Sequence, residues 1–301
     1  PPANAEQEKA RVRFRELASL RDNLNDEVRR AMRLEMESLF EYVLREDESV
    51  LDFLDCRYTF VNERLAKYYG LPPVEGSQMR RVMLPDGSPR GGVLAQGSML
   101  LVTSNPTRTS PVKRGLFILE NLLGTPAPPP PAVVPELEEA ARQFEGQDPP
   151  LRRLLEAHRA SALCKSCHAR MDPLGIALEN FDALGNWRDS EKGQPIDASG
   201  RLITGESFQD VRELKKILRA NHRLDFYRCL TQKLLIYVLG RGLEDYDEQS
   251  VDLIVERLDQ QGGRFGALLQ GVIESAPFQR SRGPSPVGNS AVQRIQAGTS
   301  S

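Results

Sequence analysis

The chain has little cysteine, with only four cysteines in 301 residues. So few thiols cannot form the disulfide framework that holds many small exported proteins together. A hydrophobic core must therefore stabilise the fold, and a chain of this length can bury one in one large or two modest domains.

The chain also has no excess of charge of one sign. Lys and Arg number 40 against 42 for Asp and Glu, which gives a net charge of -2. Such a balance provides no positive field for holding phosphate groups, so we expect no nucleic acid partner.

Long apolar runs are missing too. No stretch approaches the roughly 18 to 20 apolar residues that a membrane-spanning helix needs, so we expect no transmembrane segment. The sequence opens at Pro1 without an initiator Met, and the charged and apolar regions of a signal peptide are not seen. We expect the chain to be a fragment or a mature product.

Helical periodicity dominates what is present, and predicts a mainly α, multi-helix protein. The expected helical segments are 5–48, 58–69, 110–124, 135–144, 150–170, 172–185, 207–218, 226–239, 250–258 and 265–275. Between them, the Pro and Gly residues of 71–90 predict loops or a small irregular hairpin.

Local signals mark several ends of these segments. Gly70 and Gly124 are placed to end helices, and Ser110 with Pro111 matches an N-cap followed by a first-position proline. Asp172 and Pro173 match the same pattern, and Ser207–Asp210 matches a loose capping box. Residues 126–135 predict a stiff polyproline connector, and 281–301 a disordered tail.

One motif concentrates the scarce cysteine and histidine: Cys164-Lys165-Ser166-Cys167-His168. On a helix, positions i, i+3 and i+4 share one face, which brings Cys164, Cys167 and His168 together. Covalent attachment of haem needs this arrangement, because two sulfurs bond the porphyrin vinyl groups while the imidazole binds the iron. The motif predicts one covalent haem c on a cytochrome c-like attachment helix, with His168 as the proximal iron ligand.

Other chemistries also use closely spaced cysteines. A zinc site would need further ligands, and the sequence has no second Cys or His pair at finger spacing. A thioredoxin-like pair would need a strand, turn and helix, whereas the surrounding pattern is helical. We therefore favour haem over zinc, a thiol redox pair or an inert buried cluster.

The second axial ligand of the iron has no comparable signal. Met171 lies on the same side of the porphyrin as His168, so we reject it as a ligand. His158 lies about 15 Å from His168 along a continuous helix, and qualifies only if that helix breaks. His222 is free of this restriction and is the candidate distal ligand. Weaker candidates are Met79, Met83 and Met99, and an open sixth position is the other reading.

Residues after the motif could surround the porphyrin. The apolar set that could exclude water from it, or form ordinary core, is Leu174, Ile176, Leu178, Phe181 and Leu184. Trp187 and Arg188 follow, and their N–H groups could hold a haem propionate. A second cationic set is Arg108, Lys113 and Arg114, for which we favour simple solvation at the surface.

Cys56 and Cys229 lie far apart in the sequence. They could form a disulfide in an oxidising compartment. We favour the alternative, in which each is a small buried hydrophobe.

Several long segments of the sequence resemble segments of known proteins. These phrases are LDFLDCRYTFVNERLAKYYGLP (51–72), TSNPTRTSPVKRG (103–115), MDPLGIALENFDALGNWR (171–188) and LTQKLLIYVLGRGLEDYD (230–247). With the Cys and His motif, they resemble the C-terminal part of large secreted planctomycete-type, cytochrome-associated proteins with domains of unknown function 1592, 1588 and 1585. Larger members usually carry another cytochrome c-like domain before this region.

The resemblance implies a division of the chain. Its parts are the helical end of a 1592-type domain (1–73), a 1588-type domain with the Pro-rich connector and the haem motif (74–190), a 1585-type C-terminal helical module (191–280) and the tail (281–301). It also implies an exported haem protein, periplasmic or secreted.

The function that we expect is electron transfer by the haem of Cys164, Cys167 and His168, with a redox protein or another cytochrome domain as partner. A haem peroxidase or oxidase with an open sixth position is the enzyme alternative. A structural or docking module of a larger surface complex is the third reading.

Overall fold

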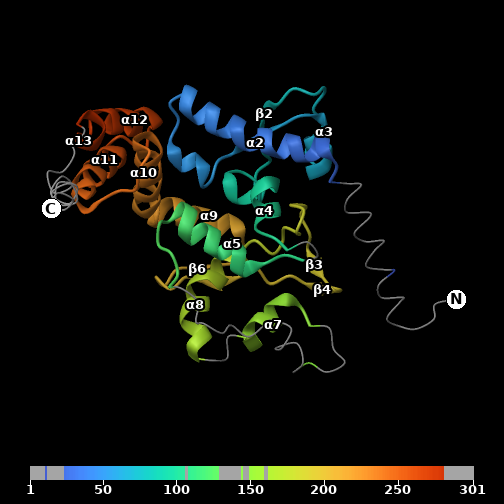
Figure 1. Ribbon diagram of the computed structural model, residues 1–301. Helices are drawn as coiled ribbons and strands as arrows, with labels where there is room; N and C mark the ends of the chain where they lie inside the picture. Colours follow the sequence, from blue (N-terminus) through green and yellow to red (C-terminus); the bar gives the residue numbers. More distant parts are fainter. Residues whose placement is uncertain are drawn as a thin grey trace, which may run out of the picture.

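The computed structural model describes residue 11, residues 24–105, 108–128, residue 144, and residues 149–158 and 162–280. Helices dominate these residues (Figure 1), which confirms the mainly helical fold class. The strands found within them form separate two-stranded antiparallel ribbons. The predicted helix at 135–144, most of the predicted polyproline connector and the predicted tail lie outside the described residues.

The first region combines a long helix with one ribbon. Helix α2 (Asp26–Arg45) is followed by β1 (Tyr58–Val61), α3 (Glu63–Tyr69) and β2 (Arg80–Met83). The prediction of one helix over 58–69 was wrong for its first four residues, which pair with β2. All four residues of β1 are buried, and aromatic and β-branched side chains favour a strand in such a place. Helix α3 ends at Gly70, as predicted.

Two short helices lead to the middle of the chain. Helix α4 (Gly97–Val102) precedes α5 (Pro111–Phe117), which continues as a π-helix, η3 (Ile118–Leu122). The Ser110 side chain accepts a hydrogen bond from the Lys113 N–H, and Pro111 opens the helix, which confirms the predicted cap. Two single 3₁₀ turns lie before them, η1 (Val50–Phe53) and η2 (Val93–Ala95).

The Cys and His motif lies on α8 (Ala162–Ile176), which follows α7 (Leu151–His158). The predicted helix start at Asp172 and Pro173 was wrong, because α8 runs through both residues. Asp172 does not cap a helix end, since its carboxylate contacts His168 one turn earlier on the same helix. The helix ends at Ile176 rather than near Gly185, and turns follow it.

Helices α5 and α8 touch through their backbones. A Cβ atom on Gly115 would lie 2.0 Å from the carbonyl oxygen of Met171, and one on Gly175 would lie 1.8 Å from that of Pro111. Any larger residue would push the helices apart, because a backbone oxygen cannot move aside as a flexible side chain can. Two glycines therefore set the distance between α5 and α8.

The C-terminal part begins with short ribbons and ends in helices. The ribbons are β3 (Ser190–Glu191) with β4 (Gln194–Pro195), and β5 (Gly200–Arg201) with β6 (Ser207–Phe208). The helices are α9 (Val211–Asn221), α10 (Arg223–Leu239), α11 (Glu248–Gln260), α12 (Phe265–Glu274) and α13 (Ala276–Gln279), with the 3₁₀ turn η5 (Asp245–Asp247) before α11. The predicted capping box at Ser207 was wrong, because Asp210 caps α9.

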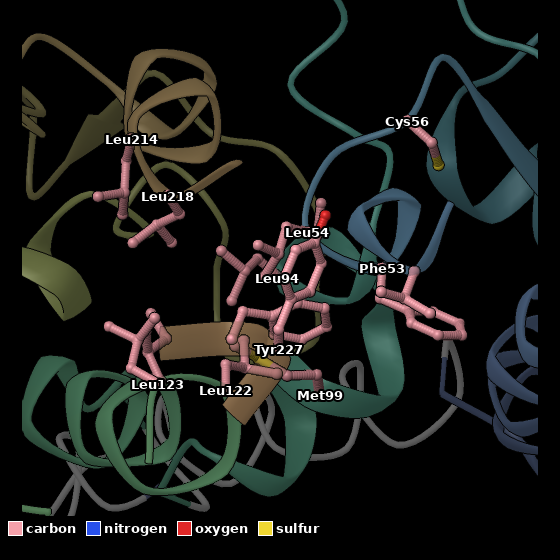
Figure 2. Packing of buried hydrophobic residues seen from close by; sticks show 14 of the residues in the cluster. Phe53, Leu54, Cys56, Leu94, Met99, Leu122, Leu123, Leu214, Leu218 and Tyr227 are labelled. Carbon is pink, nitrogen blue, oxygen red and sulfur yellow. The ribbon is translucent and has the colours of Figure 1, made fainter. Parts of the chain in front are cut away.

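One core joins segments that are far apart in the sequence. Figure 2 shows Leu54, Leu122 and Leu214 packed in the same cluster with Tyr227. A buried amine makes a second connection, because Lys215 donates hydrogen bonds to the carbonyl oxygens of Arg90 and Gly91, each at 3.0 Å. Its Nζ atom also lies 3.0 Å from Asp55 Oδ1.

Among the helices that the structure describes, none combines the length and the apolar character that crossing a membrane requires.

Candidate functional site

Helix α8 carries the Cys and His motif near its N-terminal end (Figure 1). The side chain of Cys164 lies outside the described part of the structure. Cys167 is a partly buried free thiol that packs against the main core. His168 is buried, with 8 % of its surface exposed. The helix thus holds the imidazole against the protein interior.

A carboxylate lies one helical turn after this histidine. His168 Nδ1 is 2.9 Å from Oδ1 of Asp172, and Asp172 is 0 % exposed. Residues i and i+4 of a helix lie on the same face, so the helix itself produces this contact. A buried carboxylate is costly without polar partners, and the imidazole is one such partner.

The donor set fits a covalently attached haem. Two thiols three residues apart and an imidazole one residue later would lie on one face of α8. With Nδ1 of His168 2.9 Å from Asp172, an iron ion would be bound through Nε2. Histidines that bind metal usually direct their other nitrogen to such an acceptor.

Arg114 corrects the expectation of surface solvation, because it is 0 % exposed. Its guanidinium donates to the carbonyl oxygens of Leu178 at 2.7 Å, Phe181 at 2.9 Å and Asp182 at 2.8 Å. Burial lowers the pKa of Arg114 to about 10, against the opposing effect of the nearby Glu179 carboxylate. Arg114 therefore fastens α5 to the segment that follows α8.

The other two members of that cationic set lie near the start of α5. Lys113, on α5, is exposed, and its Nζ atom donates to Asn105 Oδ1 at 2.7 Å. Arg108 precedes α5, is half-buried and has interactions of its own.

Phe181 and Trp187 contact each other, and Arg188 contacts Glu179. The Phe181 ring is fully buried and meets the Trp187 ring edge-on, with 5.1 Å between the centroids. Arg188 donates to the carbonyl oxygen of Glu179 at 3.0 Å and to its Oε2 at 3.2 Å. Trp187 donates to Asp189 Oδ1 at 2.9 Å. These donors point to protein acceptors, and a role beside the haem stays a prediction.

His222, the candidate distal ligand, lies at the junction of α9 and α10. Its Nδ1 is 3.1 Å from Asp225 Oδ2, and its Nε2 is 3.4 Å from Glu206 Oε1. Its role as an iron ligand stays a prediction, as does that of His158. His158 ends α7, and three residues outside the described part separate it from α8.

Cys56 and Cys229 do not form a disulfide. Both are buried, and their thiols donate to the carbonyl oxygens of Tyr58 at 3.1 Å and Asn121 at 3.4 Å. Burial raises the pKa of the Cys56 thiol to about 11. The interpretation as small buried hydrophobes is confirmed.

Three family models match the chain. Residues 6–71 match a protein of unknown function (DUF1592), residues 90–191 match DUF1588 and residues 204–278 match DUF1585. Three successive segments of the chain are thus similar to the DUF1592, DUF1588 and DUF1585 families. The DUF1588 match contains α5, α7, α8 and the whole Cys and His motif. Its short name, PSCyt3, hints at a cytochrome-related family. Neither the curated proteins nor the solved structures give a match.

Two features of the DUF1588 region were missed from the sequence. Asp172 was interpreted as a helix cap, although its spacing of four from His168 was a signal for a contact on one helix. The buried pair of Arg114 and Glu179 had no local signal, because its members lie 65 residues apart. Only the tertiary fold brings them together.

Proposed function

We propose that this protein, with its segments similar to DUF1592, DUF1588 and DUF1585, is an exported c-type haem protein that transfers single electrons. Cys164 and Cys167 would bond the porphyrin, and His168 would bind the iron. The observation that carries the proposal is the CxxCH sequence on one helix, with Nδ1 of its histidine already directed to a buried carboxylate.

Electron transfer changes the charge of the iron, and it is fastest when the iron ligands keep their positions. The packing around α8 favours such a fixed arrangement. The bound haem would supply the one-electron chemistry. The protein's part would be to hold the imidazole still, and the glycine contacts of α5 with α8 would help by fixing the backbone that carries it. A rigid surround keeps the rearrangement that accompanies electron transfer small.

Location and partner follow from the attachment chemistry. Thioether bonds to haem form outside the cytoplasm, so the protein would be periplasmic or secreted. A carrier also needs a donor and an acceptor, and the partner would be a redox protein or another cytochrome domain.

Peroxidase chemistry is the second candidate function, favoured by the contact of His168 with Asp172. A carboxylate partner makes an imidazole a stronger electron donor to iron, which assists cleavage of an O–O bond. The sixth coordination position separates the two functions. A low-spin, six-coordinate iron that does not react with hydrogen peroxide supports electron transfer. A high-spin iron that reacts with it supports peroxidase activity.

Haem attachment is the first test. The chain is expressed in a periplasm that holds the cytochrome c maturation proteins, and its pyridine haemochrome spectrum and intact mass are measured. We expect a c-type spectrum and the added mass of one haem. The double variant Cys164→Ala/Cys167→Ala should lose both.

The two cysteines outside the motif provide the matched control. Cys56→Ala/Cys229→Ala removes the same number of thiols and should keep the haem. The proposal would be overturned if the wild-type protein is colourless and has no added mass in cells where a control cytochrome c acquires its haem.

A further inference from the structure

The carboxylate beside His168 occupies a fixed and dry position. Asp172 is fully buried within α8, and its neighbour Met171 lies against the backbone of α5 at Gly115. On the next turn, Gly175 touches Pro111 in the same way. The backbone before and after Asp172 is therefore held against α5, and Oδ1 lies 2.9 Å from the imidazole.

The other described contact of a histidine with an aspartate differs in solvent exposure. His222 and Asp225 are three residues apart, and the Asp225 side chain is 49 % exposed. Water screens a carboxylate in such a place, whereas the charge of a carboxylate in the interior is screened less. The buried contact of Asp172 thus has electrostatic consequences that the exposed one lacks.

We infer that Asp172 is the positioning residue of the proximal histidine, and that it lowers the reduction potential of the haem. This inference rests on the proposed function. By accepting a hydrogen bond from Nδ1, the carboxylate would fix the ring orientation and the tautomer that leaves Nε2 for iron. Its negative charge, held in a dry place, favours ferric over ferrous iron, which carries one positive charge less.

The test compares the reduction potentials of three haem-loaded proteins: the wild type, Asp172→Asn and Asp252→Asn. Asparagine keeps the size of Asp172 and removes its charge. Asp252 lies on α11, is 60 % exposed, and serves as the charge-matched control. We expect the midpoint potential of Asp172→Asn to rise well above that of the wild type, and Asp252→Asn to match the wild type.

A vibrational measurement separates positioning from general stability. After photolysis of the carbon monoxide complex, the iron–histidine stretching frequency reports the strength of that bond. It should lie high in the wild type, in the range of carboxylate-bonded histidines, and fall in Asp172→Asn. Asp172→Glu, which keeps the carboxylate, should recover part of both effects.

The outcomes distinguish a failure of the proposed function from a failure of the inference about Asp172. A wild type without haem overturns the proposed function. A wild type with haem but with the low frequency of a histidine that lacks a carboxylate partner overturns the inference alone, even if no variant folds. An unchanged potential in folded, haem-loaded Asp172→Asn does the same.

Discussion

Two regions of the molecule bury a glutamate in different ways. Beside α5 and α8, Glu179 is 6 % exposed and meets two guanidinium groups, of Arg114 at 3.3 Å and of Arg188 at 3.2 Å. On α2, Glu35 is 2 % exposed and accepts hydrogen bonds from the hydroxyls of Thr59 and Tyr69, both at 2.7 Å. One carboxyl is held by charge, and the other mainly by neutral donors.

The difference determines how each region responds to change. Burial raises the pKa of both carboxyls, and the cations beside Glu179 oppose that rise. Hydroxyl donors and the more distant Arg90 oppose it less for Glu35, whose pKa rises to about 7. The region that holds the Cys and His motif should therefore depend on its ion pairs, and the α2 region on pH.

Removing the arginine should have the largest effect. Arg114→Met keeps much of the side-chain volume but removes one of the two guanidinium groups beside Glu179 and the donor that Arg114 gives to three carbonyl oxygens. We expect a loss of about 3 to 5 kcal/mol in the free energy of unfolding, measured by urea denaturation. Arg228→Met, at an exposed ion pair, should cost less than about 1 kcal/mol. Equal losses in the two variants would show that burial of the charge does not matter.

Substitution of a closely packed glycine should have the next largest effect. Gly175→Ala places a methyl group against the backbone of Pro111, and we expect a cost of about 3 kcal/mol. Gly97→Ala, in the α2 region, meets the ends of the Met32 and Tyr69 side chains, so about 1 kcal/mol is expected there. Thermal denaturation of both variants checks the order. The reverse order would mean that α5 and α8 can separate easily.

The pH response of Glu35 is the third effect. Because its pKa is raised from 4.5 to about 7, the folded state binds its proton more tightly than the unfolded state. This contribution to stability is complete below the ordinary pKa, and is lost as the pH rises through about 7. Glu35→Gln should remove about 3 kcal/mol of the stability change between acid and alkaline solution. If the free energy of unfolding of the variant changes with pH as much as that of the wild type across this window, the prediction is refuted.

The sequence predicted what depends on neighbouring residues. Helical periodicity identified α2, α5 and α9 to α12, and the caps at Gly70, Ser110 and Pro111 were correct because each needs only a few adjacent residues. The strand at Tyr58–Val61 was missed because its pairing with β2 outweighs the helical spacing of its apolar residues. A strand this short carries too little periodicity of its own.

At the candidate site, too, the sequence revealed local features and missed those that depend on the tertiary fold. The CxxCH motif is local, so the sequence alone predicts its chemistry, and its predicted place on a helix is confirmed by α8. Asp172 was assigned to a cap because Pro173 follows it, and proline opens helices more often than it lies inside them. The burial of Arg114 depends on carbonyl groups beyond α8, which no pattern near Arg114 reveals.

Lys215 affects how the three matched segments can be separated. Its ammonium, in the DUF1585 match, is bonded to carbonyl groups of the DUF1588 match and paired with Asp55 of the DUF1592 match. Cutting the gene between any two of them would expose an amine and the core around it to water. The three matched segments therefore share a buried polar contact that none of them could keep if separated from the others.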